Sequence, residues 1–225
     1  MAKPIIVCSN VCVAYGRQEV LHRVNLEIPE GIFLPFIGPN GSGKTTLLRA
    51  ILGLIPVRHG RIDTPFGHVP AGYVSQQKVI DPLFPVSVRQ IVEMGLSPKR
   101  RPWARLTRPQ RESIDKALAE FGMEEHANKN FRELSGGMKQ KVLIARAFVS
   151  KPNVIVLDEP TSELDEKSEK DVLRHLLDLN QKHGKTVLMV HHDTELVSQL
   201  SNTVCRVNRG SAEIVENGFG GNDHA

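Results

Sequence analysis

The chain has 225 residues, and its 29 basic side chains against 25 acidic ones give a formal net charge of +4. Six of the basic residues lie between residues 99 and 111, a window without any acidic residue. The remaining 23 basic side chains are balanced by the 25 acidic ones, so the positive charge is local and does not by itself indicate a nucleic-acid-binding protein. The longest apolar runs have four to five residues, far below the roughly 18 that a membrane span needs. The N-terminus also lacks the apolar stretch of a signal peptide, and three scattered cysteines favour reduced thiols over a disulfide framework or a zinc site.

The first third of the chain reads as strands. Residues 5–8, 11–15 and 20–28 alternate between apolar and polar side chains, as half-buried antiparallel strands do. A continuous apolar run over residues 32–37 then predicts a buried strand. Pro35 interrupts that run, and because proline cannot donate a ladder hydrogen bond we expect it at a sheet edge or at a local irregularity.

The middle of the chain changes from strand patterns to helical ones. A glycine-rich turn at residues 38–46 is followed by a predicted helix over 47–54 and by short strand-like pieces that end near residue 75. Helical patterns without strand signals then occupy residues 86–94, 107–121 and 136–149. We expect an inserted helical subdomain over about residues 77–150.

The last third returns to alternating strands and helices. The run at residues 154–157 is apolar throughout, as in a parallel strand that is buried on both faces. Further elements are predicted at residues 168–183 (helix), 186–190 (strand), 194–200 (helix), 203–207 and 212–215 (hairpin). The fold class is therefore α/β, with an antiparallel β part, a mostly parallel core sheet and a single domain over 1–225 whose core comprises about 1–76 and 151–225.

One glycine-rich segment has the pattern G-x4-G-K-[ST] of a phosphate-binding loop, and it stands between a predicted strand and a predicted helix, as that pattern requires. Its backbone N–H groups can face phosphates, Lys44 can reach the β- and γ-phosphates, and the Thr45 hydroxyl can bind Mg²⁺. We expect the segment to bind the phosphates of a nucleotide through Gly38, Pro39, Asn40, Gly41, Ser42, Gly43, Lys44, Thr45 and Thr46.

A pair of acidic residues ends the buried strand at residues 154–157. Asp158 is positioned to hold Mg²⁺, and Glu159 is suited to orient and deprotonate an attacking water molecule. Together with the phosphate-binding loop, this pair predicts an NTPase.

A second helix start can also bind an anion. Leu134-Ser135-Gly136-Gly137 precedes a predicted helix, with Ser135 as its N-cap and two glycines that allow close backbone approach. Unlike the phosphate-binding loop, this helix start carries no lysine.

The order of these segments resembles that of the ATP-binding subunit of an ABC transporter. The resemblance covers about residues 5–218 and rests on six segments in the family's order: Gly38–Thr45, Gln76, Leu134–Gly137, Leu157–Pro160, Ser162–Asp165 and His192. It implies an ATP-hydrolysing enzyme that acts as a head-to-tail dimer, with two ATP molecules between the phosphate-binding loop of one chain and the signature segment Ser135–Gly137 of the other.

The resemblance also implies roles for single residues. Tyr15 corresponds to the aromatic residue that stacks on adenine, and Asp165 ends the loop that lines the dimer seam. Gln76 corresponds to the glutamine that contacts Mg²⁺ and the attacking water, and His192 to the histidine that contacts the γ-phosphate. Ser135, Gly136 and Gly137 correspond to the signature that contacts the γ-phosphate of the partner's ATP. The catalytic set implied is Lys44, Gln76, Glu159 and His192, and the Mg²⁺ ligands are Thr45, Gln76 and Asp158.

The sequence departs from the family pattern at several positions. Met138 replaces the commoner glutamine after the two glycines, Glu163 replaces a small residue in the seam loop, and Ser75 replaces a common proline. His191 occupies the position where threonine is usual. None of these departures removes a catalytic group, so we expect ATP hydrolysis.

A further resemblance suggests the transported substrate. Residues 73–77, 80–81, 84–88 and 91–95 are similar to the metal-importing branch of the family, for zinc or manganese. This implies a cytoplasmic subunit on the inner face of the cell membrane, together with membrane permease subunits and an extracytoplasmic metal-binding protein, and without nucleic acid. Three alternatives to metal import stay open: transport of another substrate, transport in the export direction, and a soluble ABC ATPase that acts on nucleic acid or ribosomes. The basic window at 99–111 is either a solvated loop or a contact with lipid headgroups or the permease.

Overall fold

A computed structural model of the chain describes residues 3–67, 69–76, 85–96, 105–193, 196–197 and 200–216. Two sheets form the β part of the fold. The smaller sheet is antiparallel and has the strand order β2-β1-β4, formed by β1 (Pro4–Tyr15), β2 (Gln18–Pro29) and β4 (His59–Asp63). The larger sheet has the order β5-β6-β7-β3-β8-β9. Its strands are β3 (Phe33–Ile37), β5 (Gly72–Val74), β6 (Val154–Asp158), β7 (Thr186–Val190), β8 (Thr203–Asn208) and β9 (Ser211–Glu216).

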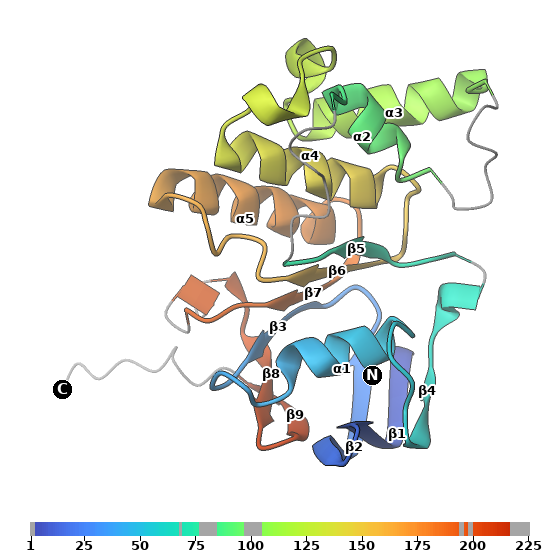
Figure 1. Cartoon of the computed structure of the whole chain (residues 1–225), viewed down its shortest axis with the longest axis vertical. Helices are drawn as coiled ribbons and strands as arrows, with labels where there is room; N and C mark the ends of the chain where they lie inside the picture. Colours follow the sequence, from blue (N-terminus) through green and yellow to red (C-terminus); the bar gives the residue numbers. More distant parts are fainter. Residues whose placement is uncertain are drawn as a thin grey trace.

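The pairing within the larger sheet is parallel from β5 to β8, and only the final β8–β9 hairpin is antiparallel. The helices lie on both sides of this sheet: α4 and α5 cover one face, α2 and α3 stand beyond them, and α1 and the small sheet cover the other face (Figure 1). The helices are α1 (Lys44–Ile51), α2 (Val88–Glu93), α3 (Arg108–Glu120), α4 (Gly136–Phe148) and α5 (Glu166–Gln181), with short 3-10 turns at η1 (Pro65–Gly67), η2 (Glu124–His126) and η3 (Phe131–Glu133). This arrangement confirms the predicted α/β class with an antiparallel part and a mostly parallel core sheet.

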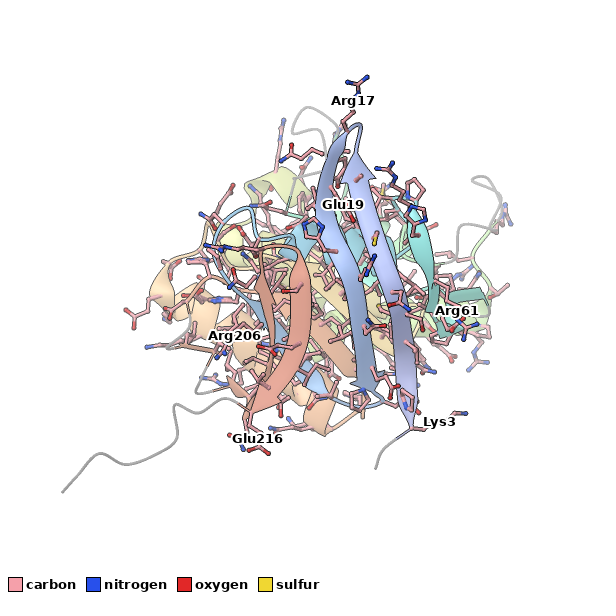
Figure 2. All side chains as sticks on the ribbon, turned by 90° about the horizontal axis from the view of Figure 1, so that it is seen from below. Lys3, Arg17, Glu19, Arg61, Arg206 and Glu216 are labelled. Carbon is pink, nitrogen blue, oxygen red and sulfur yellow. The ribbon has the colours of Figure 1, made fainter. Side chains whose placement is uncertain are left out.

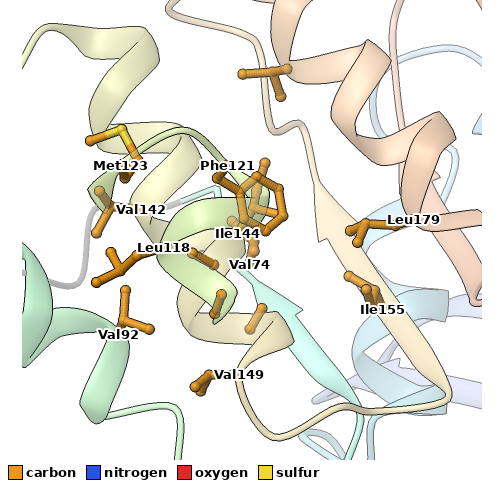
Figure 3. Close-up of a cluster of buried hydrophobic side chains, with 14 of the residues drawn as sticks. Val74, Val92, Leu118, Phe121, Met123, Val142, Ile144, Val149, Ile155 and Leu179 are labelled. Carbon is orange, nitrogen blue, oxygen red and sulfur yellow. The ribbon is translucent and has the colours of Figure 1, made fainter. Parts of the chain in front are cut away.

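The core strands separate two hydrophobic clusters, because successive side chains of a strand point to opposite faces. Ile155 and Leu157 of β6 pack on the side of α4 and α5. Val154 and Val156 pack on the side of α1 and the small sheet. Figure 3 shows part of the first cluster, in which side chains from α2, α3 and α4 meet Val74, Ile155 and Leu179. The helical layer is thus attached to the same sheet that carries the phosphate-binding loop.

The first strand is longer than the sequence pattern predicted. Two separate runs at residues 5–8 and 11–15 form one continuous strand, β1, whose pairing with β2 shifts register between Cys8 and Val11. Asn10 lies in this shift with a φ of 51°, and its N–H donates to Asn25 Oδ1 over 2.9 Å. The bulge explains why the period-2 pattern breaks there although the strand continues.

Pro35 does not lie at a sheet edge, so that part of the expectation was wrong. Strand β3 lies between β7 and β8. Val187 N–H donates to Ile32 O, and His191 N–H donates to Phe36 O. The backbone N–H and C=O groups of the even-numbered residues of β3 therefore point toward β7, and those of the odd-numbered residues point toward β8. The nitrogen of Pro35 therefore faces β8, whose pairing with β3 is confined to Phe36 and Ile37. An interior proline is tolerated because no ladder bond is due at its position.

The small sheet meets the C-terminal hairpin on the lower side of the molecule. Figure 2 shows β1 and β2 beside β8 and β9, with Arg17 at the tip of the β1–β2 turn. The His22 N–H donates to Gly210 O over 2.8 Å, which joins the two antiparallel parts. None of the described helices combines the length and the apolar character that crossing a bilayer requires.

Candidate active site

The phosphate-binding loop connects β3 to α1. Gly38 has a φ of 144°, and a Cβ at that position would lie 2.0 Å from Val207 O. Gly43 has a φ of 107°, and a Cβ there would lie 2.8 Å from Leu21 Cδ2. Both positions therefore require glycine. Helix α1 begins at Lys44, three residues earlier than predicted, so Lys44, Thr45 and Thr46 belong to the first turn, where backbone N–H groups have no helical partner.

The ammonium group of Lys44 is held by the loop itself. Its Nζ donates to Gly38 O over 2.8 Å and to Pro39 O over 3.0 Å, and the side chain is almost fully buried. Burial lowers the pKa of Lys44, while the nearby carboxylates of Glu159 and Asp158 oppose this shift. These contacts place a buried cation at the point where a phosphate group is expected.

Asp158 ends β6 directly beside the first turn of α1. Thr45 Oγ1 donates to Asp158 Oδ1 over 2.8 Å, while Asp158 Oδ2 is buried and has no hydrogen-bond partner among the described residues. Arg49 Nη2 lies 4.0 Å from Oδ2. Burial raises the pKa of Asp158, and the bond from Thr45 partly offsets this effect. The structure thus brings together two of the three predicted Mg²⁺ ligands, Thr45 and Asp158.

Glu159 follows Asp158 in a strained backbone conformation. Its φ is 50°, a left-handed value that is uncommon for a residue with a side chain and that is typical of functional sites. Gln76, which follows β5, donates from Nε2 to Glu159 Oε2 over 2.7 Å. The predicted general base and the predicted glutamine are therefore in direct contact, although 83 residues separate them. The neighbouring Gln77 lies outside the described residues.

The predicted signature segment begins α4. Ser135 is its N-cap and accepts a hydrogen bond from Met138 N–H over 3.4 Å, so the unusual Met138 still takes part in the cap. Gly137 packs tightly against α5, since a Cβ there would lie 2.8 Å from both Cβ and Oγ of Ser168. Gly136 is exposed and has more room.

Asp165 is the N-cap of α5. It accepts hydrogen bonds from Ser168 N–H over 3.0 Å and from Ser168 Oγ over 2.8 Å, and these bonds lower the pKa of Asp165. Ser168 therefore contacts both the signature glycine and the residue predicted to end the seam loop.

The two helix starts that were predicted to bind phosphate lie on different sides of the core sheet. Leu134 packs in the cluster on the α4 and α5 side, whereas Leu47 and Leu48 of α1 pack in the cluster on the opposite side. Figure 1 shows this separation of α1 from α4. Ser135–Gly137 and the phosphate-binding loop are thus not adjacent within one chain.

The two remaining predicted residues are accessible. Tyr15 ends β1 with half of its surface exposed, as a residue that stacks on a base needs to be. His192 follows β7 and is exposed, and its ring stacks on that of His191 with the centroids 5.2 Å apart and 3° between the planes.

Sequence reasoning missed two features near this site. Arg49 lies one helical turn after Thr45, and this spacing could have placed its guanidinium beside Asp158. Thr161, Glu169 and His191 form a hydrogen-bonded cluster behind His192, which no local pattern indicates because the three residues come from distant segments.

Comparisons with known proteins agree with this architecture. The sequence profile of the ABC transporter family matches residues 21–162. The chain is 37% identical over 216 residues to the zinc uptake system ATP-binding protein ZurA of Listeria monocytogenes, covering 92% of this chain and 84% of that protein. It is 38% identical over 194 residues to the manganese transport system ATP-binding protein MntB of Bacillus subtilis, covering 83% and 76%.

Solved structures show the same fold. A dimeric ATP-binding cassette in a post-hydrolysis state, bound to ADP and Pi, superposes with a TM-score of 0.77 at 29% identity and covers 94% of this chain and 98% of its own. The profile match spans more than half of the chain, and the two curated relatives exceed 30% identity over most of it. The chain therefore belongs to the ABC transporter family, as one of its ATP-binding, ATP-hydrolysing subunits.

Proposed function

We propose that this protein hydrolyses ATP to power the import of a metal ion, zinc or manganese, through separate permease subunits. The observation that carries the enzymatic part is the arrangement at the end of β6, where Thr45 contacts Asp158 and Gln76 contacts Glu159 beside the buried ammonium of Lys44. The choice of substrate rests on the similarity to ATP-binding proteins of zinc and manganese transport systems.

The site is suited to Mg²⁺. Asp158 Oδ2 is a buried carboxylate oxygen without a hydrogen-bond partner among the described residues, and such an oxygen is stabilised by a hard cation. Thr45 and Asp158 would hold the ion, with Gln76 as a further ligand once its amide leaves Glu159. When bound, Mg²⁺ would supply positive charge that offsets the negative charge of the β- and γ-phosphate groups.

Each protein group has a distinct part in hydrolysis. Lys44 exchanges its contacts with Gly38 O and Pro39 O for the phosphate oxygens of ATP. Glu159, which the left-handed backbone turns toward Gln76, orients the attacking water and accepts its proton. His192 extends from the end of β7 as a hydrogen-bond donor to the γ-phosphate.

The complete site needs two chains. Because Ser135–Gly137 and the phosphate-binding loop lie on different sides of the sheet, a second copy in head-to-tail orientation supplies the signature to each ATP. In this proposal residues 1–225 form one ATP-binding domain with its helical part at about 77–150. The dimer acts on the cytoplasmic face of the cell membrane, and an extracytoplasmic protein delivers the metal to the permease.

The enzymatic part is tested by Glu159→Gln, with Glu125→Gln on the exposed η2 turn as the matched control. The Glu159 variant should bind ATP and Mg²⁺ and accumulate as a dimer on size exclusion, with phosphate release reduced by about a hundredfold or more. The control should hydrolyse ATP at the wild-type rate. Wild-type phosphate release by Glu159→Gln would contradict the assignment of the base.

The transport part needs a separate assay. Vesicles that contain the chain and its permease should take up radiolabelled zinc or manganese when ATP is present, and should lose this uptake when Glu159→Gln replaces the wild type. If the vesicles hydrolyse ATP normally but take up neither metal, the proposed substrate is wrong, while the proposed ATPase activity stands.

A further inference from the structure

His191 is a buried polar residue directly beside the proposed catalytic residue His192. It follows β7 directly and is only 1% exposed, although its neighbour His192 is exposed. Its backbone N–H donates to Phe36 O over 3.3 Å, two residues before the phosphate-binding loop. Its side chain faces Thr161 and Glu169, which belong to the segment after Glu159 and to the first turn of α5.

The hydrogen bonds assign one tautomer to this ring. Asp193 N–H donates to His191 Nδ1 over 3.1 Å, so Nδ1 carries no proton and Nε2 carries one. Nε2 lies 3.1 Å from Thr161 Oγ1 and 3.3 Å from Glu169 Oε1, and Thr161 Oγ1 donates to the same Oε1 over 2.7 Å. Hydrogen-bond donation in the cluster therefore runs one way, from the Asp193 backbone N–H to the imidazole and from the imidazole to the Glu169 carboxylate.

This cluster connects the chain segments that carry the proposed catalytic groups. Thr161 lies two residues after Glu159, and Asp193 lies one residue after His192. The ring of His192 stacks on His191 with its plane nearly parallel, so the orientation of His191 limits that of His192.

We propose that His191 is a positioning residue for ATP hydrolysis, which holds His192 in register with Glu159 through Thr161 and Glu169. The inference rests on the proposed ATPase function. If His191 only filled the core, its replacement would lower stability without a selective effect on turnover. As a positioning residue, it affects kcat much more than ATP binding, because binding rests mainly on the phosphate-binding loop.

Two substitutions distinguish the contribution of Nδ1 from that of Nε2. In His191→Asn the amide oxygen can replace Nδ1 toward Asp193 N–H, but the side chain is too short to reach Thr161. In His191→Gln the longer side chain can place its amide N–H where Nε2–H lies. The matched control is His175→Asn in α5, because His175 is a partly buried histidine outside the site whose ring also stacks on a neighbour, Phe121, with the centroids 5.5 Å apart.

The full chain is assayed for phosphate release, for ATP affinity by calorimetry and for its unfolding temperature. His191→Asn should lower kcat about tenfold or more, with the Kd for ATP changed less than about twofold, and His191→Gln should recover most of the rate. His175→Asn should lower the unfolding temperature and leave kcat unchanged. Wild-type kcat in His191→Asn, equal losses in the Asn and Gln variants, or a kcat loss in the control as large as that in His191→Asn would each overturn the proposal.

A second variant keeps the test decisive if His191→Asn fails to fold. Glu169→Ala removes the end of the cluster and should lower kcat to a similar degree. In the double variant Glu169→Ala/His191→Gln, kcat should fall back to the level of His191→Asn, because the glutamine amide then has no carboxylate to donate to. A double variant that keeps the kcat of His191→Gln would overturn the proposal. A wild-type chain that releases no phosphate refutes the proposed ATPase function itself, which is a different outcome from a hydrolysing wild type with an insensitive His191.

Discussion

The contact between Gly137 and Ser168 predicts that two adjacent glycines respond differently to the same substitution. Both glycines lie in the first turn of α4. A Cβ at Gly136 would meet Leu164 Cδ2 at 3.4 Å, an ordinary contact, whereas a Cβ at Gly137 would lie 2.8 Å from Cβ and Oγ of Ser168. Gly137→Ala is the test and Gly136→Ala is the matched control.

The magnitude follows from two opposing terms. Replacing a helical glycine by alanine stabilises a helix by up to about 1 kcal/mol, and this gain is available to both variants. Overpacking costs about 1–3 kcal/mol and applies only to Gly137→Ala, because Ser168 Cβ is attached to the backbone of α5 and cannot rotate away. We therefore expect Gly137→Ala to be less stable than Gly136→Ala by about 1–3 kcal/mol in its free energy of unfolding.

Urea unfolding of the nucleotide-free chain measures this difference without interference from catalysis. A third variant, Ser168→Gly, removes the opposing Cβ and Oγ, so the Gly137→Ala penalty should largely disappear in the double variant, with a coupling energy of about 0.5–3 kcal/mol. If Gly137→Ala proves as stable as Gly136→Ala, or if Ser168→Gly fails to relieve it, the reasoning from this contact is refuted.

Two further predictions concern buried titratable groups. Asp158→Asn should abolish Mg²⁺-dependent hydrolysis yet raise the free energy of unfolding at neutral pH by about 1 kcal/mol, because it removes a buried charge while Thr45 keeps an acceptor. Because burial raises the pKa of Asp158, the variant and the wild type should have the same free energy of unfolding at acid pH, where Asp158 is protonated in both states. The variant's advantage should grow as the pH rises from the usual pKa range of aspartate through the raised pKa in the folded chain. An advantage in urea unfolding that does not change with pH would contradict the burial of a charge as its cause. Burial also raises the pKa of Cys8 to about 12, so maleimide should label it roughly a thousandfold more slowly in the native chain than in urea at pH 8, as peptide mass spectrometry can measure. Equal rates would show that the strand opens readily.

Local patterns were sufficient for much of this fold and for the first part of the site. Strand β7 has the predicted bounds, and the loop at Gly38–Thr45 connects the predicted strand to a helix. Such features depend on residues close in sequence, where periodicity and glycine spacing carry the information. Gln76 and Glu159 were predicted separately, and the structure brings them into contact because β5 and β6 are parallel neighbours whose carboxyl ends meet at one sheet edge.

Features that depend on distant partners could not be predicted. Pro35 is acceptable inside the sheet only because β8 begins to pair with β3 after that residue, which no property of residues 32–37 reveals. The register shift near Asn10 depends on the Asn25 side chain from the next strand. The sequence places His191 next to His192, but the buried cluster of His191 could be predicted only with knowledge of where α5 lies.

The two carbonyl contacts of Lys44 have a consequence for ligand selection. Gly38 O and Pro39 O solvate the ammonium group, so an anion that binds Lys44 has to displace two carbonyl contacts. A single weakly charged oxygen offers Lys44 little more than two well-placed carbonyls do, whereas a polyphosphate brings several charges that also engage the N–H groups of α1. These two contacts thereby favour a nucleoside triphosphate over a singly charged anion or free phosphate in solution.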